Sequence, residues 1–143
     1  MNYQINEGSF ALTSQAQDRS VHMLVLNFGP GGLTLVVTRD LAEEGELLDA
    51  MLRRQLRTLG SQVKQLKHSE PLALQVGPAR LPAFQVSTSF KQNNASVHQL
   101  QTMVALRDKA VLAFTLTCAS PLTAEQAAYA QQVLDSFTPS TPT

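Results

Sequence analysis

The side chains that could perform chemistry in this sequence are few and widely separated. Cys118 is the only cysteine, and it lies near the end of an apolar stretch, where a thiol is buried and inert rather than nucleophilic. The three histidines, His22, His68 and His98, are too far apart in sequence to match the close spacings of metal ligands. The residue patterns of a nucleophile elbow, a phosphate-binding glycine loop and a zinc protease are absent. We therefore expect no enzymatic activity, no metal and no cofactor.

Two predicted strands point instead to the binding of apolar surface. Over residues 20–28, both the odd positions, which include Val21 and Met23, and the even positions are largely apolar. A strand in a half-exposed sheet normally alternates between apolar and polar residues. In the next strand, residues 33–39, three apolar residues share one face and Val36 lies on the other. Val21, Met23 and Val36 are therefore expected to form an outward apolar surface. Either a terminus, the second predicted helix or a dimer partner covers this surface, or it is an interaction site.

Two glutamines stand among apolar residues. At about 100° per residue, Gln55 falls between Leu48 and Met51 on the apolar face of a predicted helix. Gln99 and Gln101 lie on a predicted strand, between the apolar Val97 and Met103. A buried glutamine needs partners for both its carbonyl and its amide. These side chains either bond to neighbouring strands or face a groove and bond an incoming polypeptide.

Turn residues and apolar spacing predict the elements that hold these side chains. The first twelve residues predict two short strands around Glu7 and Gly8, and Gly29–Gly32 predicts a turn between the two apolar strands. Asp40 and Glu43 have the spacing of a capping box. After it, apolar residues at three- and four-residue steps predict a helix over residues 46–67, with a weak point at Gly60.

The second half of the sequence predicts a β-meander and a final helix. Strands are expected over residues 72–76, 80–92, 96–106 and 110–119. Thr123 and Gln126 have capping-box spacing. The buried face of the helix that follows is expected to contain Ala127, Ala130, Val133, Leu134 and Phe137. The fold class is therefore α+β, a largely antiparallel twisted sheet packed by one long helix and a C-terminal helix. Residues 1–138 are expected to form a single domain and residues 139–143 a frayed tail.

Composition narrows the classes of partner. The chain has 143 residues, and its 11 basic and 11 acidic residues cancel to a net charge of zero. This balance argues against a nucleic-acid partner, which requires a basic face. Only 15% of the residues are charged, so the surface is polar but weakly charged. We see neither a signal peptide nor a run of about 20 apolar residues that could insert into a membrane. A cytoplasmic location is therefore expected.

Four segments resemble a known family: Asn2–Phe10, Leu35–Asp40, Leu52–Leu56 and Ala110–Leu112. Together they resemble the Eag chaperones of bacterial type VI secretion systems, which belong to a wider DcrB-like, Mog1/PsbP-like α+β group. The resemblance covers nearly the whole chain, but its motifs are diffuse and include no catalytic signature.

The resemblance implies a function as a chaperone. Such proteins are cytoplasmic homodimers that bind and shield the N-terminal transmembrane helices of an effector carrying a PAAR domain, and they aid its loading onto the secretion spike. By position, Val21, Met23 and Val36 correspond to the apolar client contacts and Gln55 to a client-binding glutamine. The strand glutamine corresponds to Gln101, or by a shift of register the contact falls on Thr102. The resemblance assigns no role to Gly29–Gly32.

Two other functions are compatible with the same sequence. One is a binding or regulatory module of the same fold group that acts on a soluble folded protein. The other is a small-ligand carrier or enzyme with a pocket between the sheet and the long helix.

Overall fold

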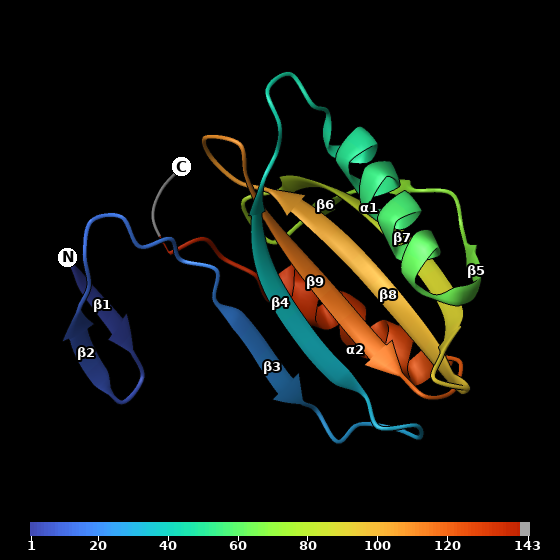
Figure 1. Ribbon diagram of the computed structural model, residues 1–143. Coiled ribbons are helices and arrows are strands. Elements are labelled where there is room, and N and C mark those ends of the chain that lie inside the picture. Colours follow the sequence, from blue (N-terminus) through green and yellow to red (C-terminus); the bar gives the residue numbers. More distant parts are fainter. Residues whose placement is uncertain (141–143) are drawn as a thin grey trace.

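The structure, a computed structural model, describes residues 1–140 and contains two sheets and two helices (Figure 1). The elements in chain order are β1 (Asn2–Ile5), β2 (Gly8–Ala11), β3 (Val21–Val25), β4 (Thr34–Leu41), α1 (Leu48–Gln62), β5 (Lys64–His68), β6 (Leu72–Val76), β7 (Leu81–Gln92), β8 (Ala95–Ala105), β9 (Ala110–Cys118) and α2 (Ala124–Ser136). The larger sheet has seven strands in the order β3-β4-β9-β8-β7-β5, and β6 also pairs with β7.

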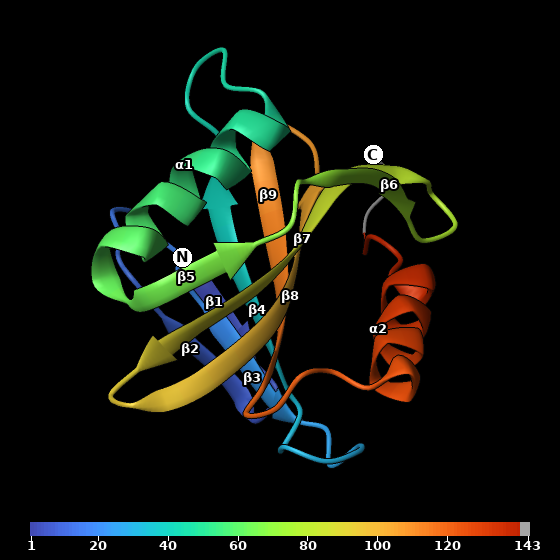
Figure 2. The same cartoon turned by 90° about the vertical axis from the view of Figure 1, so that its right-hand side faces the viewer.

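All strand pairs described in this sheet are antiparallel, and the two helices lie on opposite sides of it (Figure 2). The predicted α+β fold class is confirmed. The sheet follows the chain closely through β7, β8 and β9, whereas β4 joins it by pairing with β9, which comes much later in the sequence.

Each face of the sheet carries its own apolar core. On the side of α1, which we call the α1 face, the buried residues are Met51, Leu52, Leu56, Val86, Met103 and Val111. On the side of α2, the α2 face, the buried residues include Leu33, Leu35, Val104, Phe114, Leu116 and Leu134. Because side chains alternate along a strand, β7, β8 and β9 each contribute to both cores.

The loop between β3 and β4 is fastened to the start of α2. The predicted capping box is confirmed, because the Thr123 hydroxyl accepts from the Gln126 backbone N–H and the Gln126 side chain accepts from the Thr123 N–H. The buried Gln126 amide also donates to the carbonyl oxygens of Phe28 and Pro30, each at 2.9 Å. The Gly29–Gly32 loop therefore has a structural role, which is to connect the β3–β4 hairpin to α2.

The predicted end of the first helix is wrong. The apolar spacing extended it to residue 67, but α1 ends at Gln62 and residues 64–68 form β5. Gln65 has a φ of +58°, which a helix does not allow, and a bulge interrupts the pairing of β5 with β7. Leu66 still lies against α1, because a Cβ added to Gly60 would come within 3.3 Å of Leu66 Cδ2. The apolar spacing thus reflects packing on the same core, but from a strand.

Two smaller predictions about the helices also fail. Asp40 does not cap α1, since it lies within β4 and accepts a hydrogen bond from the Leu41 N–H. The N-cap of α1 is Leu47, which makes no side-chain capping bond. In α2, Ala127 is exposed, whereas Ala130 and Leu134 are fully buried. The buried face of α2 is thus centred on Gln126, Ala130 and Leu134.

The first twelve residues form an arm that stands apart from the seven-stranded sheet (Figure 1). β1 and β2 pair with each other as a separate antiparallel hairpin, as predicted. The arm lies on the side of the molecule where β3 forms the edge of the larger sheet. At the other end of the chain, the predicted tail begins at Pro139, and residues 141–143 of that tail lie outside the described residues.

Neither helix within residues 1–140 has the length and apolar character needed to cross a membrane.

Candidate functional site

Strand register places the predicted site residues on one face of the sheet. Met23 lies opposite Val36, Val36 opposite Thr115, and Thr115 opposite Gln101. Directly opposed residues of antiparallel strands point to the same side. These four side chains therefore form one row across β3, β4, β9 and β8, and the row ends at the buried Val86 beneath α1. The row lies on the α1 face.

The part of the α1 face that α1 leaves uncovered is the candidate site, which we call the open face. Val21 and Met23 are 58% and 69% exposed, and Val36 is half-buried. The open face consists of Val21, Met23, Val25, Thr34, Val36, Gln99, Gln101, Thr115 and Thr117. Its β3 and β4 side is apolar apart from Thr34, and its β8 and β9 side carries hydroxyls and amides.

Hydrogen bonds connect the polar side of the open face. The Gln101 amide donates to the Gln99 carbonyl oxygen at 2.8 Å, and the Gln99 amide donates to the Thr117 hydroxyl at 3.4 Å. The Thr88 hydroxyl donates to the same Gln99 oxygen at 3.4 Å. Each glutamine amide has two N–H groups, and these bonds use one of each. The network holds the glutamines in place and leaves donors for a bound polypeptide.

Gln55, on α1, lies at the rim of the open face, near the end of β4. Its amide donates to Asp40 Oδ2 at 3.4 Å, so it contacts a neighbouring strand, as one of the two interpretations expected. Gln55 as a whole is half-buried, and its side-chain carbonyl oxygen accepts no hydrogen bond from residues 1–140. Gln55 therefore combines a structural contact with a free acceptor.

The structure distinguishes Gln101 from Thr102. Gln101 is half-buried on the open face, whereas Thr102 is fully buried and lies opposite Phe114 on the α2 face. The Thr102 hydroxyl accepts a hydrogen bond from the Gln85 amide at 2.9 Å. Of these two residues, only Gln101 could contact a molecule on the open face.

None of the residues named in the open face is ionisable, and Asp40, on the same side of β4, lies at the rim beside Gln55. Arg54 forms two hydrogen bonds to the Glu46 carboxylate, at 2.8 and 3.0 Å, on the loop side of α1. These bonds lower the pKa of Glu46 and raise that of Arg54. Lys109 pairs with Glu44 in the same region. These ion pairs thus involve the segment between β4 and α1. The open face itself offers dispersion contacts and hydrogen bonds from neutral groups.

Sequence reasoning missed part of the open face. Val25 continues the alternation of Val21 and Met23, and it is 65% exposed. Thr115 and Thr117 alternate with the buried residues of β9, which is a sequence pattern that could have indicated them. The sequence could not show that Thr115 and Thr117 lie beside β4, because the pairing of β4 with β9 joins segments far apart in the chain.

The other chemistry-bearing residues do not gather into a site. Cys118 is buried, as predicted, and its thiol donates to the Pro30 carbonyl oxygen at 3.2 Å. In the part of the chain that the structure describes, no three His, Cys, Asp or Glu side chains come together as possible metal ligands.

A sequence model of the DcrB family matches residues 7–136. The chain belongs to the DcrB family. This membership confirms the wider group to which the sequence resemblance pointed, and it does not distinguish the Eag chaperones within it. The DcrB match spans β2 to α2 and so includes every residue of the open face.

A solved structure supports the fold of this DcrB-family chain. It is similar to the crystal structure of PA94 from Pseudomonas aeruginosa, a protein of unknown function described as a suggested regulator. The TM-score is 0.76, the identity is 20%, and the match covers 100% of this chain and 98% of PA94. At this identity the likeness shows the fold alone. No curated protein matches the sequence significantly.

Proposed function

We propose that this chain is a cytoplasmic chaperone that binds and shields the N-terminal transmembrane helices of a type VI secretion effector. The effector would carry a PAAR domain, and the chaperone would aid its loading onto the secretion spike. One observation carries the proposal. Residues selected from the sequence as client contacts, Val21, Met23, Val36 and Gln101, come from three strands and lie on one exposed face, with Gln55 at its rim.

The chemistry of the open face suits an apolar helix. A transmembrane helix in water exposes about 20 apolar residues, and its backbone groups are satisfied internally. It therefore needs apolar contact over most of its surface and a few hydrogen bonds for its small polar side chains. The β3 and β4 side of the open face supplies the apolar contact, and Gln99 and Gln101 supply the hydrogen bonds. An ionised side chain on this face would lose its hydration beneath the client, and the face holds none.

The open face is tested by recovery of the client. Tagged protein is isolated from its native bacterium, and its partners are identified by mass spectrometry. We expect a dominant partner with N-terminal apolar helices. Val36→Gln places a polar group at the centre of the apolar side and should remove most of that partner while leaving the circular dichroism spectrum unchanged.

Leu41→Gln is the matched control. Leu41 is in the same strand as Val36 and is 65% exposed. Because the two residues are an odd number of positions apart, the Leu41 side chain points to the α2 face. This variant should retain the partner at the wild-type level. Equal recovery with Val36→Gln would show that the open face does not hold the client. Recovery of soluble partners without apolar helices would favour the regulatory module instead.

A further inference from the structure

Positive charge is concentrated in the middle of the chain. Seven of the 11 basic residues lie between positions 53 and 91, and Glu70 is the only acidic residue in that stretch. Two of these basic residues have acidic neighbours, since Arg53 lies 3.3 Å from Glu70 and Arg54 bonds to Glu46. Four others, which we call the unpaired cations, are exposed and form no ion pair within residues 1–140: Arg57, Lys64, Lys67 and Lys91.

The unpaired cations surround β5, which is the last strand of the sheet at the end opposite to β3. β5 pairs with β7 along one edge. Figure 2 shows β5 at the front of the sheet, with α1 on one side of it and α2 on the other, so that neither helix covers its second edge. Of its five residues, only Leu66 is half-buried and the rest are exposed. β5 therefore presents an open strand edge among positive charges.

On the side of α1, this edge borders a groove that combines apolar and cationic groups. The groove lies between α1 and β5 and has a volume of about 530 Å³. Leu56, Val63 and Leu66 form its apolar lining, and Arg57 reaches it from α1. Because Arg57 has no acidic partner within residues 1–140, its guanidinium is available to a ligand in the groove.

The lysines lie on the other side of the same edge. Lys67 is opposite Ser89, which is an even number of positions along β7 from Ala83 in the core of the α2 face. Lys67 therefore points to the side of α2. Lys64 and Lys91, directly opposite each other in the next pair, point to that side as well. Like charges in directly opposed positions repel each other, and an anion between them would relieve this repulsion.

The backbone of β5 offers hydrogen bonds at the open edge. The Ser69 N–H donates to the Ser87 carbonyl oxygen at 2.9 Å, so this N–H points toward β7. The His68 C=O belongs to the same trans peptide group and points the opposite way. Along an antiparallel strand, the direction of the backbone groups reverses at each residue. His68 and Leu66 therefore direct their N–H and C=O groups toward the open edge.

We propose that an extended acidic segment of another protein binds to β5 as an added strand, with carboxylates at consecutive positions. Side chains of a strand alternate between the two faces of its sheet. One carboxylate would therefore face Arg57 on the side of α1, and the next would face Lys64 and Lys67 on the other side. The outward backbone groups of Leu66 and His68 would bond to the main chain of the segment, as in other cases of strand addition.

An acidic strand fits this edge better than other polyanions do. A bilayer presents its anionic headgroups in one plane, whereas the unpaired cations lie on both sides of β5. A nucleic-acid backbone has phosphates but no N–H groups to match the His68 carbonyl. Lysine on an edge strand discourages pairing with unselected strands. The same lysines favour a strand that carries carboxylates, so they would select the partner.

The β5 edge and the open face are separate sites. The open face extends from β3 to β8, and the sheet between it and β5 lies beneath α1. A client on the open face would leave β5 accessible. Binding at the β5 edge is therefore independent of the chaperone function, and it is measured on the purified chain without any client.

Fluorescence anisotropy with a labelled peptide tests the charge pattern. The probe is a run of glutamates as long as β5, flanked by valines, and a control peptide has glutamine in place of every glutamate. Only the glutamate peptide should bind, and its Kd should rise when NaCl screens the charges. Equal binding of the two peptides, or no saturable binding up to about 1 mM, would overturn the proposal.

Arg57→Gln and Lys67→Gln test the two sides of the edge. Each removes one exposed cation and should weaken binding by about two- to fivefold, the range expected for an exposed ion pair. Arg80→Gln is the matched control, because Arg80 lies in the β6–β7 turn, where its guanidinium donates to the Gln75 side chain at 2.9 Å. This variant should keep the wild-type Kd. Equal weakening by all three variants would show attraction to overall charge and would reject a site at β5.

Hydrogen exchange tests whether the peptide adds as a strand. The glutamate peptide should slow exchange at the outward amides of Leu66 and His68, and it should leave the Ser69 amide, which already bonds to β7, nearly unchanged. A peptide that binds without slowing the two outward amides would contradict strand addition. Vesicles containing phosphatidylserine provide the last comparison. If they bind the chain and the glutamate peptide does not displace them, a bilayer and not a strand is the partner of this edge.

Discussion

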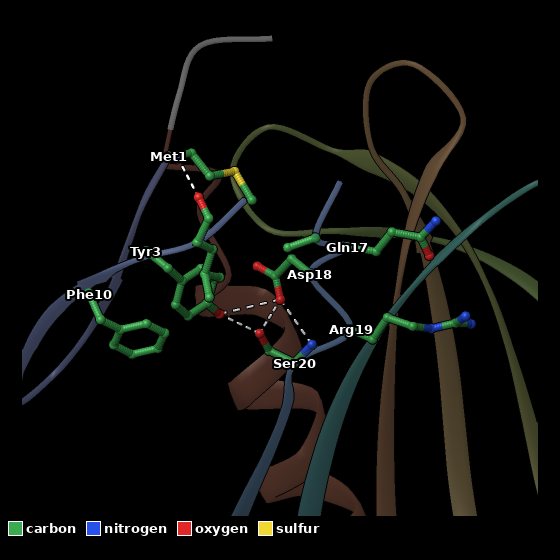
Figure 3. Close-up of a pocket in the computed structure, with 9 residues that line it drawn as sticks. Met1, Tyr3, Phe10, Gln17, Asp18, Arg19 and Ser20 are labelled. Atoms are coloured by element: carbon green, nitrogen blue, oxygen red, sulfur yellow. Dashed lines mark hydrogen bonds between the residues drawn. The ribbon is translucent and has the colours of Figure 1, made fainter. Parts of the chain in front are cut away.

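Asp18 is the residue on which the position of the arm depends. One of its carboxylate oxygens accepts from the Ser20 N–H at 2.9 Å, from the Ser20 hydroxyl and from the Tyr3 hydroxyl at 3.3 Å. The bonds from Ser20 are the main cause that lowers the pKa of Asp18 below its usual 3.8, and Arg39 contributes. The charged form of the Asp18 carboxyl is thus the one that holds Tyr3 of the arm against the segment before β3 (Figure 3).

Acid should weaken the bonds by which Asp18 holds Tyr3 and Ser20. Because the pKa of folded Asp18 is lowered, its stabilising effect is complete above pH 3.8 and is lost as the pH falls through the lower folded value. We expect an NMR titration of the Asp18 carboxyl to give a pKa below 3.8. Exchange of the Ser20 amide, corrected for its intrinsic rate, should accelerate over the same range. Asp18→Asn should lack this step, and a carboxyl that titrates at or above 3.8 would contradict the assignment.

At the scale of elements, two adjacent glycines in the β3–β4 loop can be compared directly. Gly31 and Gly32 have φ values of +87° and +69°. A Cβ on Gly31 would overlap the Ser120 hydroxyl and come within 2.5 Å of the Cys118 sulfur, whereas a Cβ on Gly32 would meet nothing within 4 Å. An L-residue at either position would thus have a strained backbone, but only at Gly31 would its Cβ also collide with neighbouring atoms.

Alanine should therefore affect the two glycines differently. Gly32→Ala should lower the free energy of unfolding by about 1–2 kcal/mol, the cost of a left-handed conformation. Gly31→Ala should cost about 1–3 kcal/mol more, because the surroundings must also move. Urea unfolding of both variants measures the difference. Equal losses would show that the loop moves away from Cys118 without cost.

The elements differ in how far the sequence determined them. The capping box of Thr123 and Gln126 is local, and it correctly predicted the start of α2. The apolar spacing through Leu66 predicted continued helix, because a helix and a strand can place the same residue against one core. The positive φ of Gln65 that ends this pattern depends on pairing between β5 and β7, which a local pattern does not contain.

The open face could be predicted in part for the same reason. Alternation within β3 and β4 indicated Val21, Met23 and Val36 as outward apolar residues. The choice between Gln101 and Thr102 required the register of β8 against β9, and the contribution of Thr115 required the pairing of β4 with β9. Sequence reasoning therefore identified the kinds of residue, and long-range pairing brought them together.

At the scale of the whole molecule, the separation of charge from the open face predicts how client binding responds to salt. Raising NaCl from about 0.1 M to about 1 M shortens the screening length from about 10 Å to about 3 Å. We expect the Kd for a dye-labelled, 20-residue apolar helical peptide, measured by fluorescence anisotropy, to change by less than about twofold. A loss of tenfold or more would indicate charged contacts and a different surface. Val36→Gln provides the background for contacts outside the open face.

The pairing of β4 with β9 also sets the order in which the molecule can be made. β4 ends at Leu41, and β9 begins at Ala110. Synthesis at about 5–20 residues per second leaves an interval on the order of ten seconds between them. During that interval the β3–β4 hairpin has left the ribosome without the strand that completes its sheet, and both of its faces carry apolar residues. A protein proposed to protect the apolar segments of another chain thus passes through a period in which its own apolar strands require protection.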